Sequence, residues 1–135
     1  MIRAMRFGLL LLALLAGGFA AEPVRIGFFM SLTGRDASFG DVSLPGARLA
    51  VAELNAAGGV LGRPVELVVE DNRSRAGESA TAVKKLIARE HVAVLIGECS
   101  SARTLEAAPI AQAAGIPLIT PADLLCSAEC RPPQP

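Results

Sequence analysis

Short apolar runs alternate with helical patterns along this chain, and that alternation limits the possible folds more than any other feature. Runs rich in β-branched and aromatic residues predict strands at residues 24–30, 65–70, 92–96 and 116–120. Apolar residues at three- and four-residue steps predict helices at residues 41–57, 77–89 and 101–114. Strands that alternate with helices form a parallel sheet through right-handed crossovers, so the sequence predicts an α/β fold.

Two prolines fall inside the predicted helices. Pro45 is expected in the first turn of the first helix, where a missing N–H is tolerated. Pro109 lies in the middle of the third helix, which we expect it to kink or interrupt.

The most informative stretch runs from residue 92 to residue 101. Its five apolar residues predict a strand buried on both faces, which Gly97 ends. A helix that begins with Ser100 and Ser101 offers N–H groups, hydroxyls and a positive dipole end to a small anionic ligand at the sheet edge. The alternative interpretation, in which either serine is only an N-cap, is compatible with this one and stays open.

Residues 1–20 predict a secretory signal peptide. Arg3 and Arg6 precede a short apolar run, and Gly18 and Ala20 fit a cleavage site after residue 20. A transmembrane anchor is the alternative, but the run is short and no stop-transfer segment follows it. We therefore expect a periplasmic protein with no stable membrane insertion after the signal is removed.

Composition argues against several classes of function. Lys plus Arg and Asp plus Glu each total 13, and Tyr and Trp are absent, so neither charge nor stacking surfaces favour nucleic acid. His91 is the only histidine and is expected on the surface before the third strand. Because one histidine supports neither a Ser/His/Asp nor a Cys/His set nor a metal site, we expect no enzyme activity, no metal and no cofactor.

The end of the chain differs from the rest. Residues 123–135 have no helix or strand period, although a doubly wound domain would continue with a helix. We expect a divergent, irregular tail, which points to a frameshifted or prematurely ended copy. It holds Cys126 and Cys130, which can pair with each other, or one of them with Cys99, and the sequence does not choose.

Four runs carry a resemblance to a known family: IGFFMSLTG, GARLAVAELNAAGGVLGRPVELVVEDN, VAVLIGECSSA and AAPIAQAAGIPLITPA. They resemble the N-terminal lobe of type I periplasmic binding proteins, in the branched-chain amino acid (Leu/Ile/Val) and amide group that serves ABC importers. The resemblance covers about residues 24–122. It implies a three-layer fold, with a mostly parallel sheet and helices on both faces, in a lobe spanning residues 21–122.

The same resemblance implies a binding protein that delivers a small amino acid or amide to an ABC permease. By position, the Ser101 hydroxyl would bind the α-carboxylate of the ligand, and the backbone of Cys99 and Ser100 would line the same wall. The carbonyl of Ala122 would accept a hydrogen bond from the ligand's ammonium group, and Phe39 would cover the ligand. Because the resemblance implies a second lobe that this sequence lacks, we expect weak binding and impaired transport.

Other interpretations of these residues stay open. Phe39 can be a loop anchor, Asp36 and Asp41 are expected as turn and cap residues, and Leu124 replaces a threonine contact of the family. Three arginines are expected as solvated charges: Arg73, Arg75 and Arg103. For the whole chain, the alternatives are a ligand-sensing receptor-type module of the same fold and a non-functional fragment.

Overall fold

Four parallel strands form one sheet in the order β2–β1–β3–β4 in the computed structural model, which describes residues 21–121. The strands are β1 (Val24–Met30), β2 (Val65–Asp71), β3 (Val94–Ile96) and β4 (Leu118–Ile119). The helices are α2 (Ala37–Ala56), α3 (Glu78–Ala88) and α4 (Ser101–Ala113). The predicted signal peptide, the contact at Ala122 and the predicted tail at residues 123–135 lie outside the described residues.

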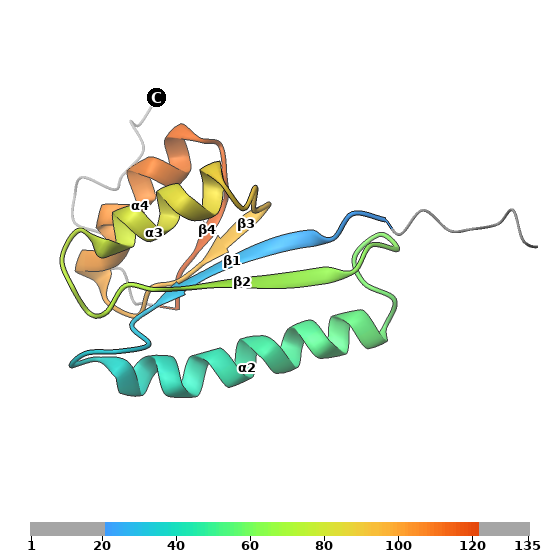
Figure 1. Cartoon of the computed structure of the whole chain (residues 1–135), viewed down its shortest axis with the longest axis horizontal. Helices are drawn as coiled ribbons and strands as arrows, with labels where there is room; N and C mark the ends of the chain where they lie inside the picture. Colours follow the sequence, from blue (N-terminus) through green and yellow to red (C-terminus); the bar gives the residue numbers. More distant parts are fainter. Residues whose placement is uncertain (1–20, 122–135) are drawn as a thin grey trace, which may run out of the picture.

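The sheet has helices on both faces, as predicted. Figure 1 shows α2 along one face and α3 and α4 together on the other. The strands pair in parallel, with Phe28 of β1 opposite Val69 of β2 on one side and Ile96 of β3 on the other. This arrangement confirms the three-layer α/β fold. No helix within residues 21–121 is long and apolar enough to cross a membrane.

The main hydrophobic core lies between the sheet and the α3–α4 layer. Phe29 and Leu95 extend from the strands into this core, where they meet Val83 and Leu86 of α3 and Ala107 of α4, all fully buried. Burying side chains of this size stabilises the fold by about 2 kcal/mol for each large residue. The core therefore ties β1, β3 and both helices into one unit.

The face of the sheet toward α2 is less completely covered. Side chains alternate along a strand, so Ile96 and Ile119 face away from the side that Leu95 occupies. Ile119 is 59% exposed, and Val94 and Ile96 are only partly buried. The prediction that this strand is buried on both faces is therefore correct for Leu95 and wrong for its two neighbours.

The start of α2 differs from the prediction, and Pro109 does not interrupt α4. α2 begins at Ala37, so Pro45 lies inside the helix rather than in its first turn. α4 continues through Pro109 without interruption. The missing N–H of Pro109 costs one helical hydrogen bond, but Ala107 and Ala111 are buried in the core on the same helix, and this packing maintains the helix.

Gly97 ends β3 at a position that requires glycine. Its φ of +143° is one that side chains with a Cβ rarely adopt, and an added Cβ would overlap the carbonyl oxygen of Phe29 on the neighbouring strand. The N–H of Gly97 still donates a hydrogen bond of 3.0 Å to the carbonyl of Ile119. The close approach of β1 and β3 at this point depends on the absence of a side chain.

Replacing Gly97 with alanine tests this close approach. We expect Gly97→Ala to lower the free energy of unfolding by about 3 kcal/mol, because both the strained backbone and the overlap oppose folding. The control is Gly46→Ala on α2, where an added Cβ has no neighbour within 4 Å. It should raise stability by about 0.5–1 kcal/mol, since alanine is the better helix former. Urea denaturation measures the free energy of unfolding of both variants. Equal effects would contradict the conclusion that Gly97 is required for the close approach of β1 and β3.

Candidate functional site

The carboxyl ends of the four strands meet at one edge of the sheet, and a polar residue follows each strand closely. These residues are Ser31 after β1, Asn72 after β2, Glu98 after β3 and Thr120 after β4. Ser31, Asn72 and Glu98 are completely buried. Every buried side-chain polar atom in the described part of the chain has a hydrogen-bond partner. This edge is therefore a satisfied polar network, next to the place where parallel α/β sheets bind ligands.

The carboxylate of Glu98, which is 0% exposed, lies at the centre of this network. Its Oε1 accepts hydrogen bonds from the N–H of Ser31 at 3.1 Å and from the Ser31 hydroxyl at 2.8 Å. Its Oε2 accepts from the N–H of Ser100 at 3.0 Å and from Nε of Arg103 at 2.9 Å. Burial alone would raise the pKa of Glu98, but the hydrogen bonds from Arg103, Ser100 and Ser31 outweigh it and bring that pKa to about 2.

The backbone of Glu98 extends the network to α4 and β4. Its carbonyl accepts hydrogen bonds from the hydroxyls of Thr104 at 3.0 Å and Thr120 at 2.9 Å. Glu98, which follows β3, is therefore bound through its side chain to the end of β1 and through its backbone to α4 and to the end of β4.

Arg103 connects Glu98 to the start of α2. Its guanidinium is held between two carboxylates: Nε donates to Glu98 Oε2 at 2.9 Å, and Nη2 donates to Asp36 Oδ2 at 2.9 Å. The hydrogen bond from Arg103 lowers the pKa of Asp36. Burial would lower the pKa of Arg103, but the bonds to Glu98 and Asp36 raise it. Arg103 is 6% exposed, so the expectation of a solvated charge is wrong for this residue.

The other two arginines, Arg73 and Arg75, are exposed as expected, and so is His91. The sequence pattern did not indicate a role for Glu98 and suggested a solvated charge for Arg103, because neither residue alone shows that the two side chains bind each other. A carboxylate directly after an apolar strand, with an arginine in the first turn of the next helix, was the available signal.

Cys99 and Ser100 lie between β3 and α4, Ser101 is the first residue of α4, and all three are partly buried. Ser100 occupies the N-cap position of α4, but its side chain makes no capping hydrogen bond. The N-cap interpretation is therefore correct for the position of Ser100 and wrong for its hydroxyl. Within residues 21–121 Cys99 forms no disulfide, and the pKa of its thiol is raised to about 11 by burial and by the neighbouring Glu98 carboxylate. A thiol with this pKa is a poor nucleophile near neutral pH.

Phe39 lies in the first turn of α2 rather than in a loop, and it is 53% exposed. The start of α2 follows β1 at the carboxyl edge of the sheet, the same edge at which α4 begins (Figure 1). The structure thus brings Cys99, Ser100 and Ser101 together and places an exposed aromatic ring on another element at that edge. Ala122, the remaining predicted site residue, lies outside the described residues.

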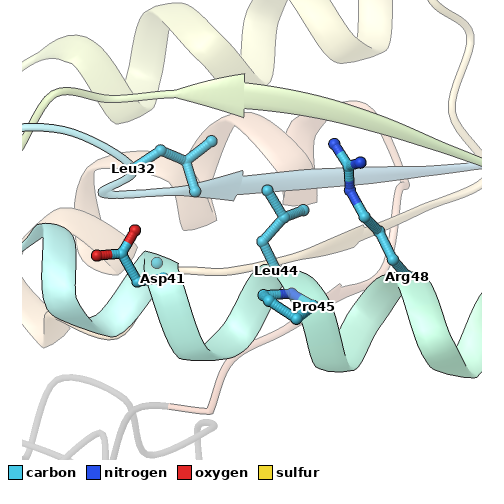
Figure 2. A pocket seen from close by; sticks show the side chains of 6 residues that line it. Leu32, Asp41, Leu44, Pro45 and Arg48 are labelled. Atoms are coloured by element: carbon cyan, nitrogen blue, oxygen red, sulfur yellow. The ribbon is translucent and has the colours of Figure 1, made fainter.

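A separate pocket of about 410 Å³ opens along α2. Figure 2 shows Leu44 and Arg48 pointing from α2 toward the strands, with Leu32 and Asp41 nearby. Its lining includes neither Phe39 nor the residues at the start of α4, so this pocket is not the predicted ligand site. Within residues 21–121, no group of three His, Cys, Asp or Glu side chains could hold a metal ion.

Comparison with known proteins gives matches over most of the chain. The sequence profile of a family described as periplasmic binding protein matches residues 23–133. The Leu/Ile/Val-binding protein homolog 7 of Brucella suis is 38% identical over 109 residues, which cover 78% of this chain and 26% of that protein.

Solved structures match as well. LivJ of Streptococcus pneumoniae, a branched-chain amino acid transporter substrate binding protein in complex with isoleucine, is 38% identical with a TM-score of 0.72. That match covers 75% of this chain and 29% of LivJ. A solute binding protein of an ABC transporter from Rhodopseudomonas palustris, in complex with 3,4-dihydroxybenzoic acid, is 25% identical with a TM-score of 0.68 over 74% of this chain and 27% of that one. The chain spans between a quarter and a third of the length of these proteins.

The Glu98 carboxylate makes the stability of the fold depend on pH. The pKa of this carboxyl is about 2 in the folded protein, against a usual value of 4.5. Because the folded-state pKa is the lower one, its stabilising contribution is complete above pH 4.5 and is lost as the pH falls toward 2. We expect this loss to reach about 3 kcal/mol, measured by urea denaturation at a series of pH values.

Glu98→Gln should remove this part of the acid dependence. It should also lower stability at neutral pH by about 3 kcal/mol, because the buried Arg103 guanidinium loses a charged partner. Glu53→Gln makes the same chemical change at an exposed position on α2 and should leave both properties as they are. An unchanged acid dependence in Glu98→Gln would show that another group is responsible.

Proposed function

This chain belongs to the periplasmic binding protein family, and from that membership we propose that it binds a small amino acid or amide as the solute-binding component of an ABC importer. The proposal includes a periplasmic location, reached through the signal peptide, and an ABC permease as the partner. In this proposed role the protein releases its ligand unchanged and does not convert it. The chain spans only part of the length of the relatives that have binding or transport in their names.

The observation that carries the proposal is the start of α4 at the carboxyl edge of the sheet. The first N–H groups of a helix have no carbonyl within the helix to bond, and the helix dipole makes this end positive. A ligand carboxylate placed here would be stabilised by both effects. In our proposal the Ser101 hydroxyl adds a direct hydrogen bond, and the backbone of Cys99 and Ser100 forms the adjoining wall.

The charges around α4 favour a ligand that is neutral overall. Arg103, in the first turn of α4, already binds the two carboxylates of Glu98 and Asp36. The ligand carboxylate would therefore meet a helix end, equivalent to about half a positive charge, rather than a separate guanidinium. Such a site suits a zwitterion or an amide better than a net anion. Isoleucine, the ligand in the LivJ structure, is a zwitterion of this kind.

The rest of the ligand needs an apolar cover and an acceptor for its ammonium group. We propose Phe39 as the cover, supported by its exposed ring at the start of α2. The carbonyl of Ala122 is the proposed acceptor. A hydroxyl, an aromatic ring and a carbonyl from three different segments would then give one contact to each chemical part of an amino acid.

Isothermal titration of the purified protein with isoleucine tests this function. We expect binding, and we expect Ser101→Ala to weaken it by about tenfold, because a hydrogen bond to a charged carboxylate is lost. Ser43→Ala makes the same change one helical turn beyond Phe39 on α2, at a residue with no proposed ligand contact, and should bind isoleucine like the wild type.

A second titration compares ligand charge. The wild-type protein should bind isoleucine more tightly than 3,4-dihydroxybenzoate, which carries a net negative charge. No binding of isoleucine, leucine, valine or a simple amide by the wild-type protein would overturn the proposed function. Equal binding by wild type and Ser101→Ala would overturn the role of the hydroxyl.

A further inference from the structure

We propose that Asp36, Arg103 and Glu98 form a positioning link that holds the start of α2 against the start of α4. The first of these elements carries Phe39 and the second carries Ser101. The inference rests on the proposed function, since those two residues are the ligand contacts that the link would hold at a set separation. Its three members touch no ligand in this proposal and act only through the segments that they join.

The α4 end of the link is rigid. Glu98 accepts hydrogen bonds from the N–H of Ser100 at 3.0 Å and from Nε of Arg103 at 2.9 Å. One buried carboxylate therefore binds the N-cap residue of α4 and a side chain of its first turn. Because Glu98 also binds the N–H and the hydroxyl of Ser31, the start of α4 is anchored to the end of β1 as well.

The α2 end of the link is unusual for its position. Asp36 stands at the N-cap of α2, where an aspartate commonly binds N–H groups of its own helix. Here its side chain makes no capping hydrogen bond, and its Oδ2 instead accepts one from Nη2 of Arg103 at 2.9 Å. The interaction is thus used to join two helices rather than to stabilise one.

The main hydrophobic core of the described residues does not join α2 to α4. α2 and α4 lie on opposite faces of the sheet (Figure 1), so the core beneath α4 does not include α2. The nearest support for Asp36 is polar: its N–H donates to the Ser74 hydroxyl at 3.2 Å, and that hydroxyl donates to the carbonyl of Thr33 at 2.8 Å. These bonds shape the turn before α2, and the bond to Arg103 sets where that turn lies relative to α4.

Asp36→Asn separates positioning from general stability. The Glu98–Arg103 pair stays in place in this variant, so we expect the midpoint of urea unfolding to change little. Amide hydrogen exchange of residues 33–40 in the ligand-free protein should become about fivefold faster, while exchange in α3 stays the same. The affinity for isoleucine should fall about threefold, because the ligand must then order the segment on binding. Asp36→Glu, which keeps the carboxylate, should restore much of both.

Asp41→Asn is the matched control, since it makes the same change on the same helix at an exposed residue that does not belong to the link. It should behave like the wild type in exchange and in affinity. Unchanged exchange at residues 33–40 in Asp36→Asn would overturn the link itself. Faster exchange with unchanged isoleucine affinity would overturn its role at the ligand site. If the wild-type protein binds no isoleucine, the proposed function fails, and the exchange data alone decide whether the link holds the start of α2.

Discussion

An ionised carboxylate without solvent exposure is the constraint on which the carboxyl edge of this sheet depends. Removing a carboxylate from water is costly unless several donors surround it. For Glu98 those donors come from β1, through Ser31, and from the segment that leads into α4, through Ser100 and Arg103. The fold can bury Glu98 only when these elements meet in one arrangement. The same arrangement brings Ser101 to the carboxyl edge of the sheet, so the geometry of the proposed site follows from the need to satisfy one charge.

The parts of the fold that depend on local patterns could be predicted from the sequence. β1 has the predicted bounds, α3 is about one residue shorter than predicted at each end, and α4 ends about one residue early. Apolar runs and helical spacing report burial directly, and burial decides these elements. The place of Cys99, Ser100 and Ser101 where a strand ends and a helix begins followed from the same patterns, because Gly97 marks the end of the strand.

The remaining features depend on partners that are distant in the sequence. Asp36 and Arg103 are 67 residues apart, and so are Ser31 and Glu98. Taken singly, Asp36 suggests a cap or turn and Arg103 a solvated charge, and neither pattern reveals that the two side chains meet. α2 also begins earlier than predicted, directly after Asp36, which places Phe39 in a helix. The same limit applies to the exposure of Ile119, since whether a strand face is covered depends on where the helices pack.

The pairing of Arg103 with two carboxylates also determines the charge that lies next to the proposed binding site. An unpaired guanidinium beside Ser101 would attract any small anion, because a full charge acts over a longer distance than a directed hydrogen bond. With both carboxylates bound to it, Arg103 contributes structure instead of attraction. The proposed site then relies on N–H groups and a hydroxyl whose directions are set by α4. Recognition of this kind depends on the orientation of the ligand carboxylate. The buried salt bridges of Arg103 make that dependence possible, because they neutralise a positive charge that would otherwise attract anions in any orientation.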